Sequence, residues 1–174
     1  GVFVLNLLEQ LSQFSQYLSK VIVTYNVLEG SRVKMQGYPF EVCIIDNEKP
    51  KGFGANHNQA FELCSTEYFC VMNPDIFLDA DPFPKLLSCH IDRNISISAP
   101  TVLNMKGLKE NSARKFPNFF SLAGKVLGIY NDIYKVSSNE SIVNPDWLAG
   151  MFLLIRSDVY SSLLGFDESF FLYY

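Results

Sequence analysis

The sequence is poor in the residues that build metal clusters, disulfide frameworks and nucleic-acid surfaces. Its 174 residues include only two histidines and four cysteines, and the cysteines show no CxxC spacing. Lysine and arginine number 14 against 18 aspartates and glutamates, so the net charge is −4. This balance argues against a general nucleic-acid binder, which needs a basic surface. It does not argue against binding one nucleotide, for which a few local donors suffice.

Long apolar runs and several common catalytic motifs are also missing. The runs at 42–45 and 152–155 have the length of strands, far below the roughly 20 residues of a membrane span. No GxSxG or HExxH motif is present. Cys43 and Cys70 lie inside apolar runs, which favours buried, reduced thiols and a cytoplasmic location.

What is present is an alternation of helical and strand-like patterns. Helical spacing of apolar residues predicts a helix over 3–19, and further helices are expected at 55–64, 81–90, 119–130 and 157–165. Strands are expected at 21–25, 40–45, 68–72, 95–99 and 151–155. This order indicates one α/β domain with a mostly parallel sheet and helices on both faces. In such sheets ligands bind outside the carboxyl ends of the strands, here 24–26, 46–47, 73–75 and 100–101.

The segment Asn73-Pro74-Asp75 places one carboxylate at the end of an apolar strand. Pro74 removes a backbone donor, so strand pairing should stop there. Asp75 is suited to hold Mg²⁺ or Mn²⁺, which prefer oxygen ligands and share them with substrate phosphates. The alternative interpretation is an ordinary turn, because Asn-Pro-Asp is good turn chemistry.

Two glycines, Gly52 and Gly54, precede the helix expected at 55–64. Glycines before a helix let the backbone approach a ligand closely, and the helix start offers N–H groups to an anion. The alternative is that they simply start the helix.

Two acids, Asp167 and Glu168, follow the helix-ending Gly165 and precede the aromatic run 170–174. They could form a carboxylate pair at the rim of an apolar acceptor pocket, where raised pKa values would favour general-base work. The alternative is a helix-ending turn followed by a core strand.

Taken together, these segments resemble the inverting GT-A glycosyltransferases of family 2, and among them the rhamnosyltransferase-like enzymes of bacterial polysaccharide synthesis. The matching segments, in order, are Gly52-Phe53-Gly54 with Asn58, Asn73-Pro74-Asp75, Arg114-Lys115-Phe116-Pro117, Trp147-Leu148-Ala149-Gly150 with Arg156, and 165–173. Order and spacing agree from about residue 21 to the last residue.

The resemblance implies transfer of a sugar from a UDP- or dTDP-sugar to a saccharide or lipid-linked saccharide, with inversion, in cell-surface polysaccharide (lipopolysaccharide) synthesis. It implies a donor side with Tyr25, Asn26, Gly52, Gly54, Asn58, Asn73, Asp75 and Arg114, and an acceptor side with Trp147, Gly150 and Asp167. Asp75 would hold the divalent metal, and Asp167 and Glu168 would be the catalytic carboxylates. Trp147 could equally be a core residue. The lipid-linked acceptors of the family imply peripheral contact with the cytoplasmic face of the inner membrane.

Two departures accompany the resemblance. The stretch between Asn26 and Phe40 is too short for a helix, so 3–19 corresponds to the family's first helix and 21–26 to its second strand. The family's first strand would then lie outside residues 1–174, and Tyr25 would replace the usual base-contacting aspartate. The Glu-Asp pair that carries the family's catalytic base would follow Tyr174. We therefore expect residues 1–174 to be a single, incomplete GT-A domain.

Two other functions stay open at this stage. A degenerate or truncated member of the family could bind a nucleotide sugar, or nothing, without catalysis. A nucleotidyltransferase shares the general architecture, but the sequence has no GxGxRxxPxTxxxPK-like stretch.

Overall fold

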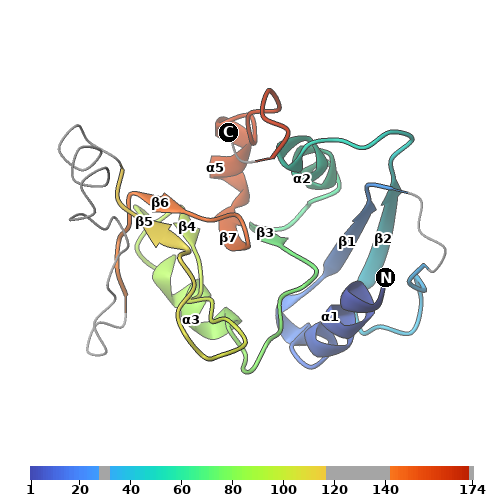
Figure 1. The fold of residues 1–174 in the computed structure, drawn as a ribbon, viewed down its shortest axis with the longest axis horizontal. Coiled ribbons are helices and arrows are strands. Elements are labelled where there is room, and N and C mark those ends of the chain that lie inside the picture. Colours follow the sequence, from blue (N-terminus) through green and yellow to red (C-terminus); the bar gives the residue numbers. More distant parts are fainter. Residues whose placement is uncertain (28–31, 117–141, 173–174) are drawn as a thin grey trace.

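The computed structural model describes residues 1–27, 32–116 and 142–172 (Figure 1). The helices are α1 (Val2–Ser12), the 3-10 helix η1 (Ser15–Tyr17), α2 (Phe53–Phe61), α3 (Phe83–Cys89) and α5 (Ser157–Ser162). The strands are β1 (Lys20–Tyr25), β2 (Glu41–Asp46), β3 (Tyr68–Met72), β4 (Ile97–Ser98), β5 (Ala113–Arg114), β6 (Trp147–Leu148) and β7 (Phe152–Arg156). None of these helices is long and apolar enough to cross a membrane.

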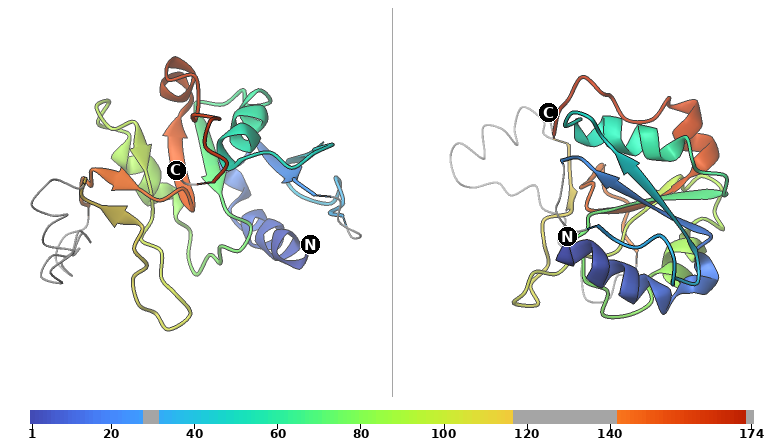
Figure 2. Two further views of the ribbon diagram at one scale, coloured as in Figure 1. Left: turned by 45° about the horizontal axis from the view of Figure 1, so that its top comes forward. Right: turned by 90° about the vertical axis from the view of Figure 1, so that its right-hand side faces the viewer.

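The strands form three separate sets. β1 and β2 pair in parallel, from Lys20 opposite Glu41 to Tyr25 opposite Asp46. β7 lies between β3 and β4 and runs antiparallel to both. β5 and β6 form a short antiparallel pair at the opposite side of the molecule from β1 and β2 (Figures 1 and 2).

Helices cover the strands on two faces, and a core lies on each. Side chains of α1 and α3 pack with alternate residues of the strands in one core, which contains Leu8, Leu11, Val23, Phe83, Leu86 and Phe152. Residues of α2 and α5 pack on the other face in a second core with Ile45, Ala60, Phe69, Val71, Leu153 and Tyr160. In Figure 1, α1 and α3 lie below the strands and α2 and α5 above them. The α/β class expected from the sequence is therefore confirmed.

Most predicted elements are present with shifted ends. The strand at 68–72 is found with the predicted bounds. The helix predicted over 3–19 stops at Ser12, whose hydroxyl bonds to the Leu8 carbonyl (2.8 Å) and competes with the helical backbone bonds. A 3-10 turn follows at Ser15–Tyr17. The helix expected at 119–130 lies outside the described residues.

One departure from the expected parallel sheet concerns β7. This strand enters from β6 through a three-residue connection at 149–151 and runs against both of its neighbours. An alternating pattern of strands and helices predicts parallel pairing only where a helical crossover joins the two strands. No helix separates β6 from β7, so the direction of β7 is outside what that pattern predicts.

Candidate active site

The carboxyl ends of β1 and β2 are tied to the start of α2 by asparagine side chains. Asn26 Oδ1 accepts hydrogen bonds from the Lys51 N–H (2.8 Å) and from Asn47 Nδ2 (3.0 Å). Asn47 Nδ2 also donates to Asn56 Oδ1 at 2.6 Å. Asn47 Oδ1 is buried and has no hydrogen-bond partner among the described residues. The network leaves one buried acceptor unsatisfied at the ligand-binding edge.

The end of β3 reaches the same edge. The Asn73 N–H donates to the Met151 carbonyl (2.9 Å), and the neighbouring Gly150 lies so close to Phe53 that a Cβ there would meet its ring at 2.7 Å. At the opposite edge, Lys20 Nζ bonds to the Leu63 carbonyl at the end of α2 (3.2 Å), and β3 begins five residues later. β1, β2 and β3 therefore run in the same direction and end near the start of α2.

Tyr25, placed on the donor side by the resemblance, is a core residue with 4 % exposure. Its hydroxyl accepts a hydrogen bond from the Val33 N–H (2.9 Å), and the Arg32 guanidinium lies 5.5 Å from its ring centre. Arg32 also pairs with Asp46 at the end of β2 (2.6 Å). The exposed polar groups at this strand end are thus Arg32 and Asp46; Asp46 belongs to a predicted strand end, whereas no sequence signal marked Arg32.

The two glycines of the Gly52-Phe53-Gly54 motif make room for the C-terminal segment 166–171. A Cβ at Gly52 would lie 2.8 Å from the Phe171 carbonyl oxygen, and a Cβ at Gly54 would lie 3.0 Å from Phe166 Cβ. The Phe53 N–H donates to the same Phe171 oxygen at 2.8 Å. Part of the helix start that was expected to meet an anion is therefore occupied by the protein's own backbone.

Asn58 fixes the turn that carries the two candidate carboxylates. Its Oδ1 accepts from the Phe166 N–H (2.9 Å) and from the Tyr160 hydroxyl (2.6 Å). Its Nδ2 donates to the Phe166 carbonyl and to Glu168 Oε1, both at 2.9 Å. Burial raises the pKa of Tyr160, which keeps its hydroxyl protonated as the donor. All polar atoms of the Asn58 side chain are thus used within the protein.

Asp167 and Glu168 are both exposed, and their surroundings differ from the expected apolar rim. Hydrogen bonds from Ser169 lower the pKa of Asp167, and its Oδ1 accepts from the Ser169 N–H at 2.9 Å. The prediction of a raised pKa is therefore wrong for Asp167, because donors rather than apolar groups face its carboxylate. The core strand considered for 170–174 is also absent over 170–172, where Phe170 and Phe171 are exposed.

Asp75 lies in a turn, as the alternative interpretation predicted. The Ile76 N–H donates to the Asn73 carbonyl (3.3 Å), and the exposed Asp75 carboxylate has no partner among the described residues. The described part of the chain contains no group of three or more histidine, cysteine, aspartate or glutamate side chains that could hold a metal. A single free carboxylate fits a cation that takes its other ligands from water and phosphate, as Mg²⁺ does, and does not fit an all-protein metal site.

Arg114 and Trp147 face each other across β5 and β6. The Arg114 guanidinium carbon lies 5.4 Å from the Trp147 ring centre, a cation–π arrangement. Trp147 is 39 % exposed, so the core interpretation of this residue is wrong. Arg114 Nε is buried without a hydrogen-bond partner among the described residues. Arg156, the other basic residue of the resemblance, is taken up by an ion pair with Asp158.

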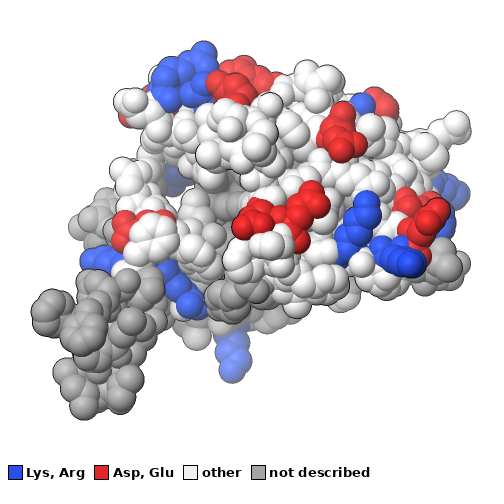
Figure 3. Space-filling view, turned by 90° about the horizontal axis from the view of Figure 1, so that it is seen from above, with Lys and Arg blue, Asp and Glu red and all other residues white. Residues whose placement is uncertain are grey.

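The structure thus brings together some of the predicted site residues and separates others. Asn26, Gly52, Gly54, Asn58, Asn73, Gly150, Asp167 and Glu168 gather around the start of α2 and the strand ends beside it. Arg114 and Trp147 belong to the separate β5–β6 pair (Figure 1). Acidic and basic side chains are interspersed on the face that carries α2 and α5 (Figure 3), so no basic surface for a nucleic acid is visible there.

Comparison with known proteins adds a family and two relatives. The model of the family "Glycosyl transferase family 2" matches residues 6–139. The rhamnosyltransferase WbbL of Escherichia coli is 28 % identical over 132 residues, 70 % of this chain and 50 % of WbbL. The low-salt glycan biosynthesis hexosyltransferase Agl10 of Haloferax volcanii is 24 % identical over 139 residues, 77 % of this chain and 43 % of Agl10. The chain spans about half the length of these curated relatives. Because the family model covers well over half of the residues, the chain belongs to glycosyltransferase family 2.

Proposed function

We propose that this chain forms the donor-binding part of an inverting glycosyltransferase that acts in cell-surface polysaccharide synthesis. It would use a UDP- or dTDP-sugar and a saccharide or lipid-linked saccharide acceptor, at the cytoplasmic face of the membrane. The observation that carries the proposal is the family match, which spans the strand ends and Asp75. Family membership and the α/β architecture support a GT-A fold for the chain.

The donor would lie at the edge where β1, β2 and β3 end. Asn26, Asn47 and Asn73 are located there, and the unsatisfied Asn47 Oδ1 is an acceptor suited to an N–H of a nucleobase. Tyr25 would support this end from inside the core rather than stack on the base. Gly52, Gly54 and Asn58 would act indirectly, because their contacts hold the 166–171 segment in place.

Asp75 is the residue that would hold Mg²⁺ or Mn²⁺ with the donor diphosphate. When bound, the cation stabilises negative charge on the leaving diphosphate. The carboxylate is exposed and unpartnered among the described residues, which leaves it available for this purpose. Arg114 would supply a further positive charge for the diphosphate or for an anionic acceptor, and its partner Trp147 has enough exposed ring to stack on an acceptor sugar.

In the proposed reaction an acceptor hydroxyl oxygen forms a bond to the anomeric carbon of the donor. The bond from that carbon to the diphosphate oxygen breaks, its electron pair stays on the diphosphate, and the hydroxyl proton goes to a carboxylate. Asp167 is a weak base because its pKa is lowered, and Glu168 is hydrogen-bonded to Asn58. Both would therefore shape the acceptor side with Gly150, and the base would be another carboxylate of the full protein.

The same carboxylate environments favour one alternative, a nucleotide-sugar-binding domain without catalysis. Calorimetric titration of the chain with UDP- and dTDP-sugars in the presence of Mn²⁺ tests donor binding directly. We expect binding by the wild type, binding weakened at least about tenfold in Asp75→Asn, and unchanged binding in the matched control Asp79→Asn. Absence of binding, or equal weakening in both variants, would contradict a donor site at Asp75. Transfer to an acceptor with the same donor separates the enzyme from the binding domain.

A further inference from the structure

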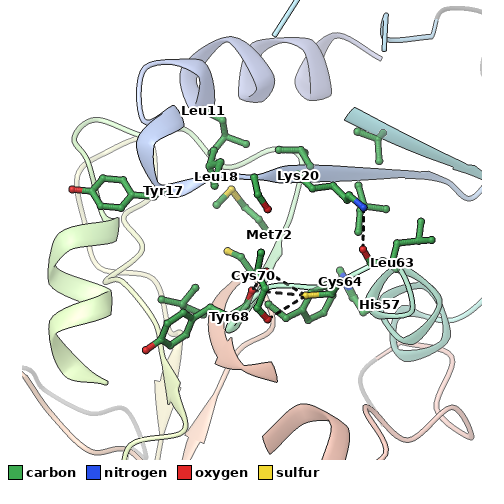
Figure 4. A pocket seen from close by; sticks show the side chains of 18 of the residues that line it. Leu11, Tyr17, Leu18, Lys20, His57, Leu63, Cys64, Tyr68, Cys70 and Met72 are labelled. Atoms are coloured by element: carbon green, nitrogen blue, oxygen red, sulfur yellow. Dashed lines mark hydrogen bonds between the residues drawn. The ribbon is translucent and has the colours of Figure 1, made fainter. Parts of the chain in front are cut away.

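A cavity of about 700 Å³ separates the two larger strand sets. Its walls are β1 on one side and β3 on the other, with the whole length of both strands contributing. The apolar face of α1 (Val4, Leu7, Leu8 and Leu11) covers it on one face, and α2 covers it on the other through Phe53, His57 and Ala60. Figure 4 shows the labelled side chains of β1, β3 and α2 around this space.

The edge of β1 that faces the cavity is an unpaired strand edge. The Ser19 and Tyr25 carbonyls accept ladder bonds from the Glu41 and Asn47 N–H groups of the β2 side. Backbone groups point to alternate sides along a strand, so the odd-numbered residues of β1 face β2. The N–H and C=O groups of Ile22 and Thr24 therefore face the cavity, and no described residue bonds to them.

The edge of β3 is unpaired in the same way. Glu67 and Asn73 bond through their backbone to Ser157 and Met151, so the odd-numbered residues of β3 face β7. The backbone groups of Tyr68, Cys70 and Met72 then face the cavity. Among the described residues, only the Tyr68 carbonyl has a partner there, the Thr66 hydroxyl at 2.8 Å. Two unpaired edges of parallel strands thus face one apolar space.

We infer that this cavity is the position of one further β-strand, which runs parallel to β1 and directly precedes α1 in the chain. An extended backbone presents N–H and C=O groups to both of its sides, so it alone can pair with two facing edges at once. Both faces of the space are apolar, which requires apolar side chains on both faces of the strand, as in buried parallel strands.

The length and direction of α1 support this occupant. Its 11 residues extend about 16 Å, which equals about five residues of strand. α1 runs against β1, and the N-terminus lies at the edge where β1 ends (Figure 2, right). A strand that ends there and continues into α1 and β1 forms a βαβ unit, the usual connection between parallel strands. The sheet would become continuous, in the order β2, β1, new strand, β3, β7, β4.

This strand would also end between Asn26 and Asn73, inside the candidate site. The inference agrees with the expectation that the family's first strand lies outside residues 1–174, but it stands on the two sheet edges and the cavity between them. It does not depend on the proposed function.

Hydrogen exchange of an extended protein tests the inference. We would fuse a designed strand of about six valine and isoleucine residues, followed by a short turn, in front of Gly1 of the whole chain. The matched control carries a proline at the centre of the fused strand, which removes a ladder donor without removing apolar surface. Amides of Val21 and Val23, which already face β2, serve as an internal reference.

We expect the amides of Ile22, Thr24, Cys70 and Met72 to exchange at least about a hundredfold more slowly with the fused strand than without it. The proline control should give much less protection, while β7 remains protected in all three proteins as a check of folding. Unchanged exchange at these four amides would overturn the inference. Equal protection by the proline control would overturn it too, because the cavity would then accept apolar material without strand pairing.

Discussion

At the scale of single residues, the motif residues are tied to contacts that are distant in the sequence. Gly52 meets Phe171, Asn58 meets Glu168, and Gly150 meets Phe53. The sequence identified all of these positions through their motif, but it could not identify their partners. A glycine in a motif indicates that space is needed there, and only the folded chain shows that backbone from position 171, not a phosphate, fills it.

His57 illustrates how burial changes the chemistry of one residue. Desolvation lowers its pKa from 6.5 to about 4, and its ring lies 4.4 Å from that of Phe53. The unfolded chain therefore binds a proton that the folded chain excludes between these pH values. The contribution to stability is complete above pH 6.5 and is lost as the pH falls towards 4.

We expect the free energy of unfolding to fall by about 2 kcal/mol less between pH 7 and pH 4.5 in His57→Gln than in the wild type. Urea unfolding at the two pH values measures this difference, and comparing the pH response of each protein cancels the titration of the other groups. An identical response would mean that His57 is protonated in the folded protein at pH 4.5.

At the scale of elements, the sequence predicted strands and helices well where the pattern is local. β3 has the predicted bounds because apolar residues and the following Asn73-Pro74 define both its burial and its end. The end of α5 was also predictable, since Gly165 has φ +78°, a conformation that favours glycine. The direction of β7 and the break in α1 depend on neighbours in space and on the Ser12 hydroxyl, which periodicity does not report.

The turn after α5 gives a prediction with a matched control. Gly165 and Gly107 both have positive φ, +78° and +73°, so alanine strains the backbone at each. At Gly165 a Cβ would in addition lie 2.2 Å from Asn58 Oδ1, whereas at Gly107 nothing lies within 4 Å.

We expect Gly107→Ala to cost about 1 kcal/mol and Gly165→Ala to cost about 2–3 kcal/mol more, because it also breaks the Asn58 hydrogen bonds. Thermal or urea unfolding of both variants measures the two costs. Equal losses would show that Asn58 moves aside without penalty and does not fix the turn.

At the scale of the whole molecule, the carboxyl ends of three parallel strands, the start of α2 and the C-terminal segment meet at one edge. The rule that ligands bind at this edge of an α/β sheet was available from the sequence and agrees with the arrangement. The cavity between β1 and β3 was not, because a missing neighbour leaves no trace in the periodicity of the strands that flank it.

Phe166 connects the two sides of this edge. Its ring lies 5.6 Å from Phe53 and 5.4 Å from Tyr160, so it packs against both α2 and α5. Phe170, four residues further on, is exposed and has no ring contact among the described residues. Because α2 and α5 are about a hundred residues apart, we expect this ring to couple their stabilities: Phe166→Ala should cost about 2–3 kcal/mol, Phe170→Ala less than about 1 kcal/mol. Amide exchange should accelerate in both helices in Phe166→Ala; acceleration confined to 166–172 would mean that the segment lies on α2 without stabilising it.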